Sequence, residues 1–211
     1  MTRTLGAPDH HRIADAIRAA EAKTSGEIYC VVARSSDSYF YPSAFFAALA
    51  VMAVSLAAAF ALEYWWVSIR LPVFWAAVTL ALASCWLVLA LAPGIRMHFV
   101  PRGLRYRRAH DNALKQFLAR NVHITAERTG VLIFVSLAER YAEVVADAGI
   151  NAKVPQQTWN GIVAELVGHA RSDRLADGFV AAVATAGALL EIHFPRRADD
   201  ANELRDHLVE I

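Results

Sequence analysis

The stretch SAFFAALAVMAVSLAAAFAL, residues 43–62, contains no charged residue and follows closely on EIYCVVAR, residues 27–34. Twenty helical residues at about 1.5 Å each extend roughly 30 Å, which is the thickness of the hydrocarbon core of a bilayer. A second uncharged run, LPVFWAAVTLALASCWLVLALA, occupies residues 71–92. The two runs predict a transmembrane hairpin of two helices that interrupts a globular domain.

The turn between the two runs supports this interpretation. It reads EYWWVSIR and contains Tyr64, Trp65 and Trp66, amphipathic aromatics that favour the headgroup depth of a membrane. The alternative is a pair of helices buried in a large soluble core. Soluble helices usually keep a polar stripe, and neither run has one. We therefore expect the lipid bilayer to be a partner of this chain.

Basic residues indicate the orientation of the hairpin. Arg96, Arg102, Arg105, Arg107 and Arg108 follow the second run, whereas the turn contains a single arginine. The positive-inside rule then predicts a multi-pass protein of the bacterial inner membrane, with both termini and the soluble domain in the cytosol. Arginines at this position usually hold the topology and contact anionic lipid, so no nucleic-acid partner is predicted. Arg96, Arg102 and Arg105 join the turn aromatics as predicted membrane-interface residues.

The remaining chain is expected to form one domain from two pieces, because 42 residues are too few for a core of their own. The predicted strands cover residues 27–34, 131–136 and 141–147. A helix precedes Gly26, and further helices are expected at residues 105–121, 155–170, 173–191 and 201–210. The predicted organisation is residues 1–42 (first part of the domain), 43–94 (hairpin), 95–195 (remainder of the domain) and 196–211 (C-terminal helix).

The first strand is apolar on both faces, and therefore needs a cover on both sides. Its side chains alternate between two sets, Ile28, Cys30 and Val32 on one face and Tyr29, Val31 and Ala33 on the other. A short β-sheet sandwiched by helices, of the α/β class, satisfies this requirement. The hairpin is then an insertion into the loop after the first strand.

Several segments together carry a resemblance: TSGEI at 24–28, GVLIFVSLAER at 130–140, ADAGI at 146–150, Trp159 and HFP at 193–195. They resemble the TPM domain family, in the membrane-anchored form common in proteobacteria. The resemblance covers roughly residues 8–34 and 105–195, and implies an α/β/α sandwich. Members of the family include a thylakoid-lumen protein associated with acid phosphatase activity, calcium-binding bacterial domains and an animal receptor accessory subunit. Membership therefore predicts fold better than activity.

Three acidic residues at predicted strand ends are candidate ligands for a divalent cation, calcium or magnesium: Asp37, Glu139 and Asp147. Strand ends are where α/β folds open their sites, and hard cations take oxygen ligands. The alternative is that all three are ordinary solvated loop residues. Ser136 lacks the strand-turn-helix elbow of a serine nucleophile, and the pair His110-Asp111 is more typical of a solvated helix face.

The predicted function is an accessory or protein-interaction module anchored in the membrane. The alternative is a weak divalent-metal-dependent acid phosphatase that uses Asp147 with Asp37 or Glu139. Transport is disfavoured, since neither predicted span carries an ionisable residue of the kind that marks ion paths.

Small residues also form a ridge on each predicted span: Ala53, Ala57 and Ala61 on the first, and Ala77, Ala81 and Cys85 on the second. Such ridges allow close helix packing. They could serve packing within the hairpin, or against a second copy or another membrane protein.

Overall fold

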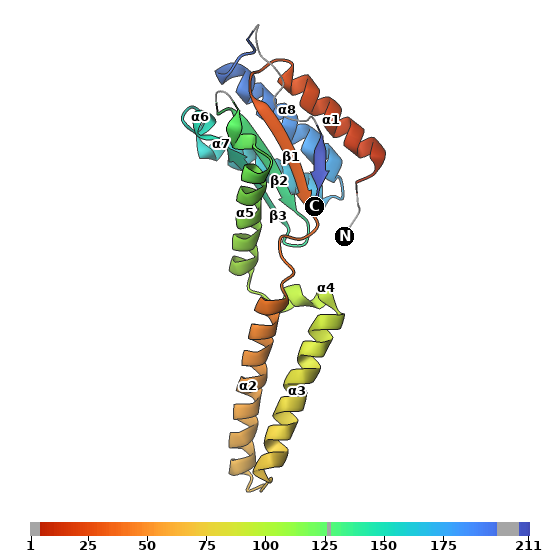
Figure 1. Ribbon diagram of the computed structural model, residues 1–211, viewed down its shortest axis with the longest axis vertical. Helices are drawn as coiled ribbons and strands as arrows, with labels where there is room; N and C mark the ends of the chain where they lie inside the picture. The colour runs from red at the N-terminus through yellow and green to blue at the C-terminus, as the bar shows by residue number, and fades with distance from the viewer. Residues whose placement is uncertain (1–4, 126–127, 198–206) are drawn as a thin grey trace. The chain divides into compact units, whose positions relative to one another are not determined.

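The computed structural model describes residues 5–125, 128–197 and 207–211, and divides into two compact units (Figure 1). One unit combines residues 1–36 with residues 106–211, and the other consists of residues 37–105. The first is an α/β unit and the second is a helical hairpin with a short elbow. Segments on either side of the hairpin thus build one sheet.

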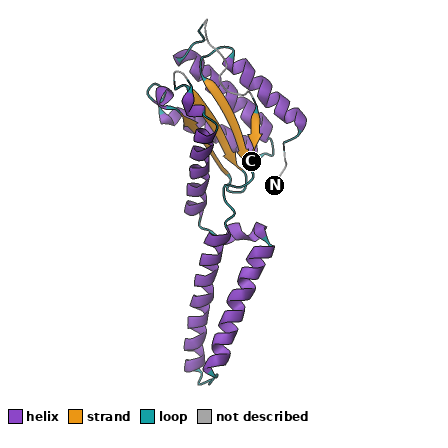
Figure 2. Ribbon diagram, in the orientation of Figure 1, coloured by secondary structure: helices purple, strands orange, loops and turns teal. Residues whose placement is uncertain are grey.

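The sheet has four strands in the order β3-β2-β1-β4 (Figure 2). Their bounds are Glu27–Ala33 for β1, Gly130–Ser136 for β2, Tyr141–Ala146 for β3 and Leu208–Glu210 for β4. β1 runs parallel to both of its neighbours, β2 and β4. β3 runs antiparallel to β2. The three strands predicted from the sequence are confirmed to within one residue at most ends.

Helices cover both faces of the sheet, as the two apolar faces of β1 require. On one face lie α1 (Ala7–Glu21), α7 (Gln156–Arg171) and α8 (Leu175–His193), which share a core with Ile28, Cys30 and Val32. On the other face, α5 (Arg102–Ala119) shares a smaller core with Tyr29, Val31 and Ala33. Figure 1 shows this three-layer arrangement of the α/β unit. The predicted α/β class is confirmed.

Two short helices connect the layers. The 3-10 helix η2 (Val122–Ile124) follows α5, and α6 (Ala148–Asn151) follows β3. The sequence indicated neither of them as a helix.

The end of the chain differs from the prediction. A helix was expected over residues 201–210, of which 201–206 lie outside the described residues. Leu208–Glu210 form β4, which pairs with Cys30, Val31 and Val32 of β1. Leu208 is buried in the core of the α1 face, so pairing with the open edge of β1 overrides the helix predicted for these residues.

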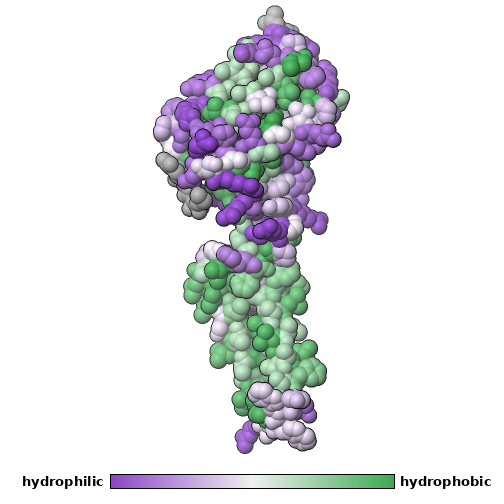
Figure 3. All heavy atoms as spheres, turned by 180° about the vertical axis from the view of Figure 1, so that it is seen from behind, coloured by the Kyte–Doolittle hydropathy of each residue, from purple (hydrophilic) through white to green (hydrophobic). Residues whose placement is uncertain are grey.

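The hairpin unit consists of α2 (Phe40–Tyr64), α3 (Leu71–Leu91), α4 (Pro93–Arg96) and the 3-10 helix η1 (Met97–Phe99). Three helices of the described chain are long and apolar enough to cross a membrane by length and composition: α2, α3 and α8. They differ in burial. Only 6% of the most apolar window of α2 and 11% of that of α3 are buried, against 44% for α8. Figure 3 shows hydrophobic residues covering the hairpin on the face in view.

Small-residue packing within the hairpin differs from the prediction. α2 and α3 pack through a cluster of Ala44, Ala47 and Leu89, joined by Phe40 and Cys85. Of the predicted ridges, Cys85 faces this contact, whereas Ala53, Ala57, Ala61, Ala77 and Ala81 are exposed. Small residues therefore do line this contact, but they are Ala44 and Ala47 of α2 rather than the predicted alanines.

Candidate functional site

Polar side chains gather where the parallel strands β1 and β2 end. Ser35 and Ser36 follow β1, and Ser136 is the last residue of β2, opposite Ala33. The backbone pairing continues past the strands, since Leu137 N–H donates to Ala33 O at 2.9 Å. Ligand sites of α/β folds usually lie at this edge of the sheet, so these residues form the candidate functional site.

Glu139 is the centre of this cluster, and its side chain is only 3% exposed. Its Oε1 accepts hydrogen bonds from Ser36 N at 2.9 Å and from Ser35 Oγ at 3.4 Å. Its Oε2 accepts a hydrogen bond from Ser136 Oγ. A buried carboxylate is costly unless such donors surround it, so these contacts are what allow Glu139 to lie here.

The cluster extends to the helix α5. Ser36 Oγ lies 2.9 Å from Ser136 Oγ, and Asn112 Nδ2 of α5 donates to Ser36 Oγ at 3.4 Å. Through these bonds one carboxylate fixes the residues that follow β1, the β2–β3 turn and α5 together. These hydrogen bonds therefore stabilise Ser35 and Ser36, the residues with which the chain leaves β1.

Asp147 lies at the opposite end of the sheet from Glu139. Because β3 runs antiparallel to β2, its last residues lie beside Gly130, and Asp147 N–H donates to Gly130 O at 2.9 Å. The length of β3 separates the two carboxylates by roughly 20 Å, at about 3.4 Å per residue. Asp147 Oδ1 accepts from Ala148 N at 2.6 Å and caps α6. Its Oδ2 is buried and has no hydrogen-bond partner within the described residues.

Asp37 belongs to the hairpin unit, where its Oδ1 receives hydrogen bonds from Ser38 Oγ at 3.4 Å and Tyr39 N at 3.5 Å. Among the residues that the structure describes, no group of three or more His, Cys, Asp or Glu side chains is placed to hold a metal ion. One site that contains both Glu139 and Asp147 is not formed. Because β2 and β3 are antiparallel, the end of β2 and the end of β3 lie at opposite ends of the sheet.

His110 has a partner that the sequence did not reveal. Its Nδ1 lies 2.9 Å from both carboxylate oxygens of Glu143 on β3, and Tyr141 O–H donates to Glu143 Oε2 at 2.9 Å. Burial, and then the nearby Glu143 charge, raise the pKa of Tyr141. The alternation along β3 could have indicated that Tyr141 and Glu143 share the face that α5 covers. His110 is therefore not simply part of a solvated helix face.

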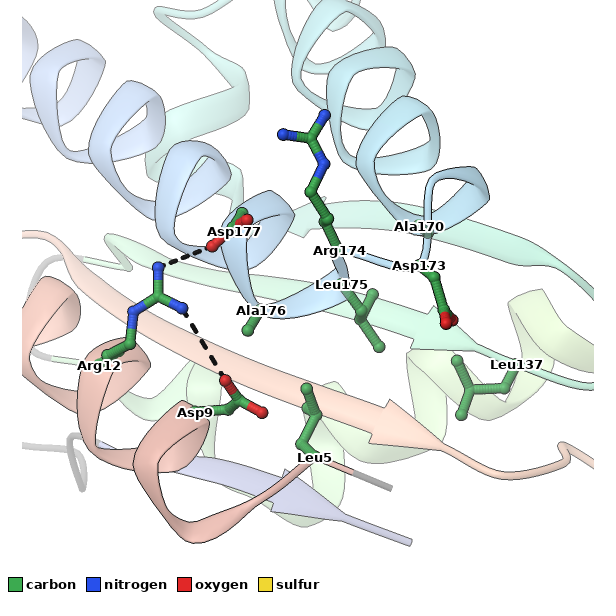
Figure 4. Close-up of a pocket in the computed structure, with 10 residues that line it drawn as sticks. All are labelled: Leu5, Asp9, Arg12, Leu137, Ala170, Asp173, Arg174, Leu175, Ala176 and Asp177. Atoms are coloured by element: carbon green, nitrogen blue, oxygen red, sulfur yellow. Dashed lines mark hydrogen bonds and ion pairs between the residues drawn. The ribbon is translucent and has the colours of Figure 1, made fainter. Parts of the chain in front are cut away.

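A cavity of about 250 Å³ lies beside the ends of β1 and β2 in the α/β unit (Figure 4). Its walls come from the starts of α1 and α8, the end of α7 and Leu137 after β2. Arg12 Nη2 donates to Asp177 Oδ1 at 2.6 Å, and Arg12 Nη1 lies 3.8 Å from Asp9 Oδ1. The arginine is thus already engaged by two carboxylates, and the pair with Asp177 joins α1 to α8.

The ion pair in this cavity predicts a pH effect. The hydrogen bond from Arg12 lowers the pKa of Asp177 below its usual value. A lowered pKa in the folded state contributes stability above the unfolded pKa, near 4, and this contribution is lost as the pH falls through the folded value. We expect Asp177→Asn to lower the urea midpoint at pH 7 slightly and to leave it unchanged at pH 2. Asp173→Asn, in the same cavity, is the control, and an equal loss in both variants would contradict the assignment.

The predicted interface residues all lie in the hairpin unit, but they differ in their contacts. Tyr64 at the end of α2 and Trp65 and Trp66 in the turn that follows are highly exposed, Trp66 at 94%. Arg96 is turned inward. Its Nε donates to Leu89 O at 2.8 Å, and its other nitrogens donate to Ala90 O at 3.1 Å and Ser38 O at 3.2 Å. Arg96 therefore caps carbonyls that the end of α3 leaves without helical partners.

The fold and this edge of polar strand ends define an α/β sandwich with an inserted helical hairpin. Residues 94–189 match the family model described as TPM domain, which confirms the resemblance for this part of the chain. The chain is also similar to the BA42 protein from the psychrophilic bacterium Bizionia argentinensis, whose structure was solved by NMR. The two are 20% identical with a TM-score of 0.62, over 100% of this chain and 98% of that chain. No curated protein matches the chain.

Proposed function

We propose that this chain is a membrane-anchored protein of the TPM type, whose α2–α3 hairpin crosses the bacterial inner membrane and whose α/β unit acts as an accessory or interaction module. The exposure of α2 and α3 carries the proposal. Both helices are strongly apolar, with mean hydropathies of 2.4 and 2.2, yet only 6% and 11% of their most apolar windows are buried. Apolar surface of this extent is unfavourable in water and favourable in hydrocarbon.

The helix α8 provides the internal comparison. It is also long and apolar, with a mean hydropathy of 1.6, but its buried residues pack into the core of the α/β unit. Many of the apolar side chains of α8 are therefore buried within the protein, whereas those of α2 and α3 need an apolar environment outside it. The proposed anchor consists of α2 and α3 alone.

The charges that flank the hairpin support a cytosolic α/β unit. Five arginines lie between residues 96 and 108, against Arg70 and Glu63 in the turn. Under the positive-inside rule this difference retains the arginine-rich side in the cytosol. Both chain ends then lie in the cytosol.

An accessory role agrees with the state of the candidate site. Ser136 is fully buried, and Glu139 is held by the backbone and hydroxyl groups around it. These side chains stabilise the residues that follow β1, and they are not exposed for contact with a substrate. We do not propose the metal-dependent phosphatase, which needs converging carboxylates.

Membrane extraction tests the anchor. We expect the full chain to remain in the membrane pellet after alkaline carbonate treatment, since two spanning helices are not released when peripheral contacts are broken. A peripheral α/β protein of the same cells is the control for extraction. Recovery of the chain in the supernatant would contradict the anchor.

Thiol labelling tests the orientation. In a Cys30→Ala, Cys85→Ala background, we expect Ser68→Cys in the turn to react with an impermeant maleimide in spheroplasts. Ser172→Cys at the end of α7 should react only after lysis. Labelling of both positions in intact spheroplasts would exclude the proposed hairpin, and the reverse pattern would exclude the orientation.

A further inference from the structure

We propose that the edge of β1 that β4 covers is a docking site for an extended segment of a partner protein, and that residues 207–211 are the chain's own, displaceable occupant of this site. The partner segment adds parallel to β1 and carries two consecutive apolar residues followed by an acidic residue. The inference deepens the proposed function and rests on it, because it names the binding surface of the interaction module. All residues of the site belong to the α/β unit.

β4 lies at one edge of the sheet (Figure 1) and pairs over a shorter length than the other described strands. β1 pairs with β2 over seven residues and β2 with β3 over six, whereas β4 pairs with residues 30–32 of β1. Leu208 is buried, Val209 is half-buried and Glu210 is exposed. Segments that bury little apolar surface open at a low cost in free energy. We therefore expect β4 to leave the sheet before any other described strand.

The backbone of β1 provides the general part of the site. Ile211 N–H donates to Val32 O at 3.0 Å, and Arg34 N–H donates to Ile211 O at 2.8 Å, so the pairing continues past the end of β4. An extended segment of another sequence can make the same hydrogen bonds, because they involve backbone groups alone. Addition of a strand to a sheet edge is a common mode of peptide recognition, in which backbone hydrogen bonds give affinity and the sites for alternate side chains give specificity.

The side chains of β4 define which segment fits this edge. Leu208 is buried in the core of the α1 face, and Val209 packs on the other side of the sheet against the core of the α5 face. Glu210 returns to the α1 face, where its Oε1 lies 3.0 Å from His10 Nε2. The edge thus accepts an apolar residue, a second apolar residue and an acidic residue in succession, and these three positions give the expected pattern of the partner segment.

A short strand at this edge also protects β1, because an open edge pairs readily with other chains. Protection and docking are two states of the same edge. A partner segment has few contacts to replace, and the pair formed by His10 and Glu210 lies at the surface. The apparent affinity of the edge for a partner is reduced in proportion to the fraction of chains in which β4 still covers it.

Peptide binding to the full chain in detergent tests the inference. The probe is the synthetic peptide GGHLVEI, which reproduces residues 207–211 after a spacer and carries fluorescein at its amino end. Its binding is measured by fluorescence anisotropy. Leu208→Asp places a charge in the core of the α1 face and should remove β4 from the edge. We expect this variant to bind the probe more tightly than the parent chain by a factor on the order of ten, because its edge is already open.

Three controls accompany this measurement. Ile192→Asp introduces the same charge at an exposed position of α8 and should bind the probe as weakly as the parent chain. The peptide GGHDVEI, which lacks the leucine, should not bind to the Leu208→Asp variant. The peptide GGYIVDV, which keeps the pattern in a different sequence, should bind to that variant with an affinity similar to that of the probe. Pulse proteolysis reports whether the variant remains folded.

A cross-linked chain gives a second test that does not depend on the Leu208→Asp variant. In the Cys30→Ala, Cys85→Ala background, His10→Cys and Glu210→Cys are joined by a short bismaleimide, because the two native side chains meet at 3.0 Å. We expect the cross-link to abolish the binding of the probe that the same chain shows before treatment. In a mixture of chains that each carry one of these two substitutions, we expect no cross-link between chains.

Three results would overturn the inference. They are equal binding of the probe by the parent chain and by a folded Leu208→Asp variant, unchanged binding after cross-linking, and binding of GGHDVEI. Cross-links between chains in the mixture would instead assign the edge to a second copy of the chain, through strand exchange. Carbonate extraction separates this failure from that of the anchor. A chain that stays in the membrane pellet without binding the probe at this edge refutes the docking site alone.

Discussion

Gly130→Ala is expected to cost the α/β unit about 3 kcal/mol or more, a large share of the roughly 5 to 15 kcal/mol that stabilises a typical domain. Gly130 is the buried first residue of β2. A Cβ atom there would lie 2.1 Å from the carbonyl oxygen of Val122 and 2.7 Å from its Cγ1. Val122 is itself fully buried in η2, so neither backbone can yield without opening the core. The urea midpoint of the detergent-solubilised chain, measured by pulse proteolysis, reports this loss.

The control for this prediction is Gly161→Ala. Gly161 lies within α7, and a Cβ atom there meets no other atom within 4 Å. Alanine favours a helix over glycine by roughly 0.5 to 1 kcal/mol, so this variant should be slightly more stable than the parent. An unchanged midpoint for Gly130→Ala would show that η2 does not pack against β2 as described.

Glu139→Ala is expected to destabilise the α/β unit by roughly 2 to 4 kcal/mol. The substitution leaves the N–H group of Ser36 and the fully buried hydroxyl group of Ser136 without their acceptor. Buried donors that lose a charged partner cost about 1 to 3 kcal/mol each, less what Ser136 recovers through Ser36 Oγ. For a unit of this size the melting temperature should fall by roughly 2 to 4 °C per kcal/mol.

Two variants complete this experiment. Glu139→Gln keeps the shape and one acceptor oxygen, and should lose about half as much stability as the alanine variant. Glu165→Ala, on the exposed side of α7, should change stability by less than about 0.5 kcal/mol. An equally small loss of stability in Glu139→Ala and Glu165→Ala would show that the polar cluster does not stabilise the residues that follow β1.

Much of the fold could be predicted from hydrophobic patterning. The apolar alternation of β1 indicated a strand covered on both faces, and its two sets of side chains do lie in two separate cores. The helices α2 and α3 were predicted from two long runs without charged residues. Long patterns of this kind depend on the local sequence alone, and the structure has the predicted elements at these residues.

The features that could not be predicted depend on partners distant in the sequence. Leu208 becomes part of a strand because the edge of β1 is open there, which its neighbours in the sequence do not reveal. His110 meets Glu143 only because α5 packs on β3. In each case a tertiary contact decides a position that local residues leave open.

The position of β1 at the centre of the sheet has a consequence for synthesis. Cys30 of β1 pairs with Ile133 on one side and Leu208 on the other. Both neighbours of β1 are therefore synthesised only after the whole hairpin. Until residues 130–136 have been made, β1 has no partner on either edge, and until residues 208–210 have been made, one of its edges remains open. Apolar strands with open edges tend to aggregate, so the insertion of the hairpin after β1 prolongs the time during which this strand is exposed to aggregation.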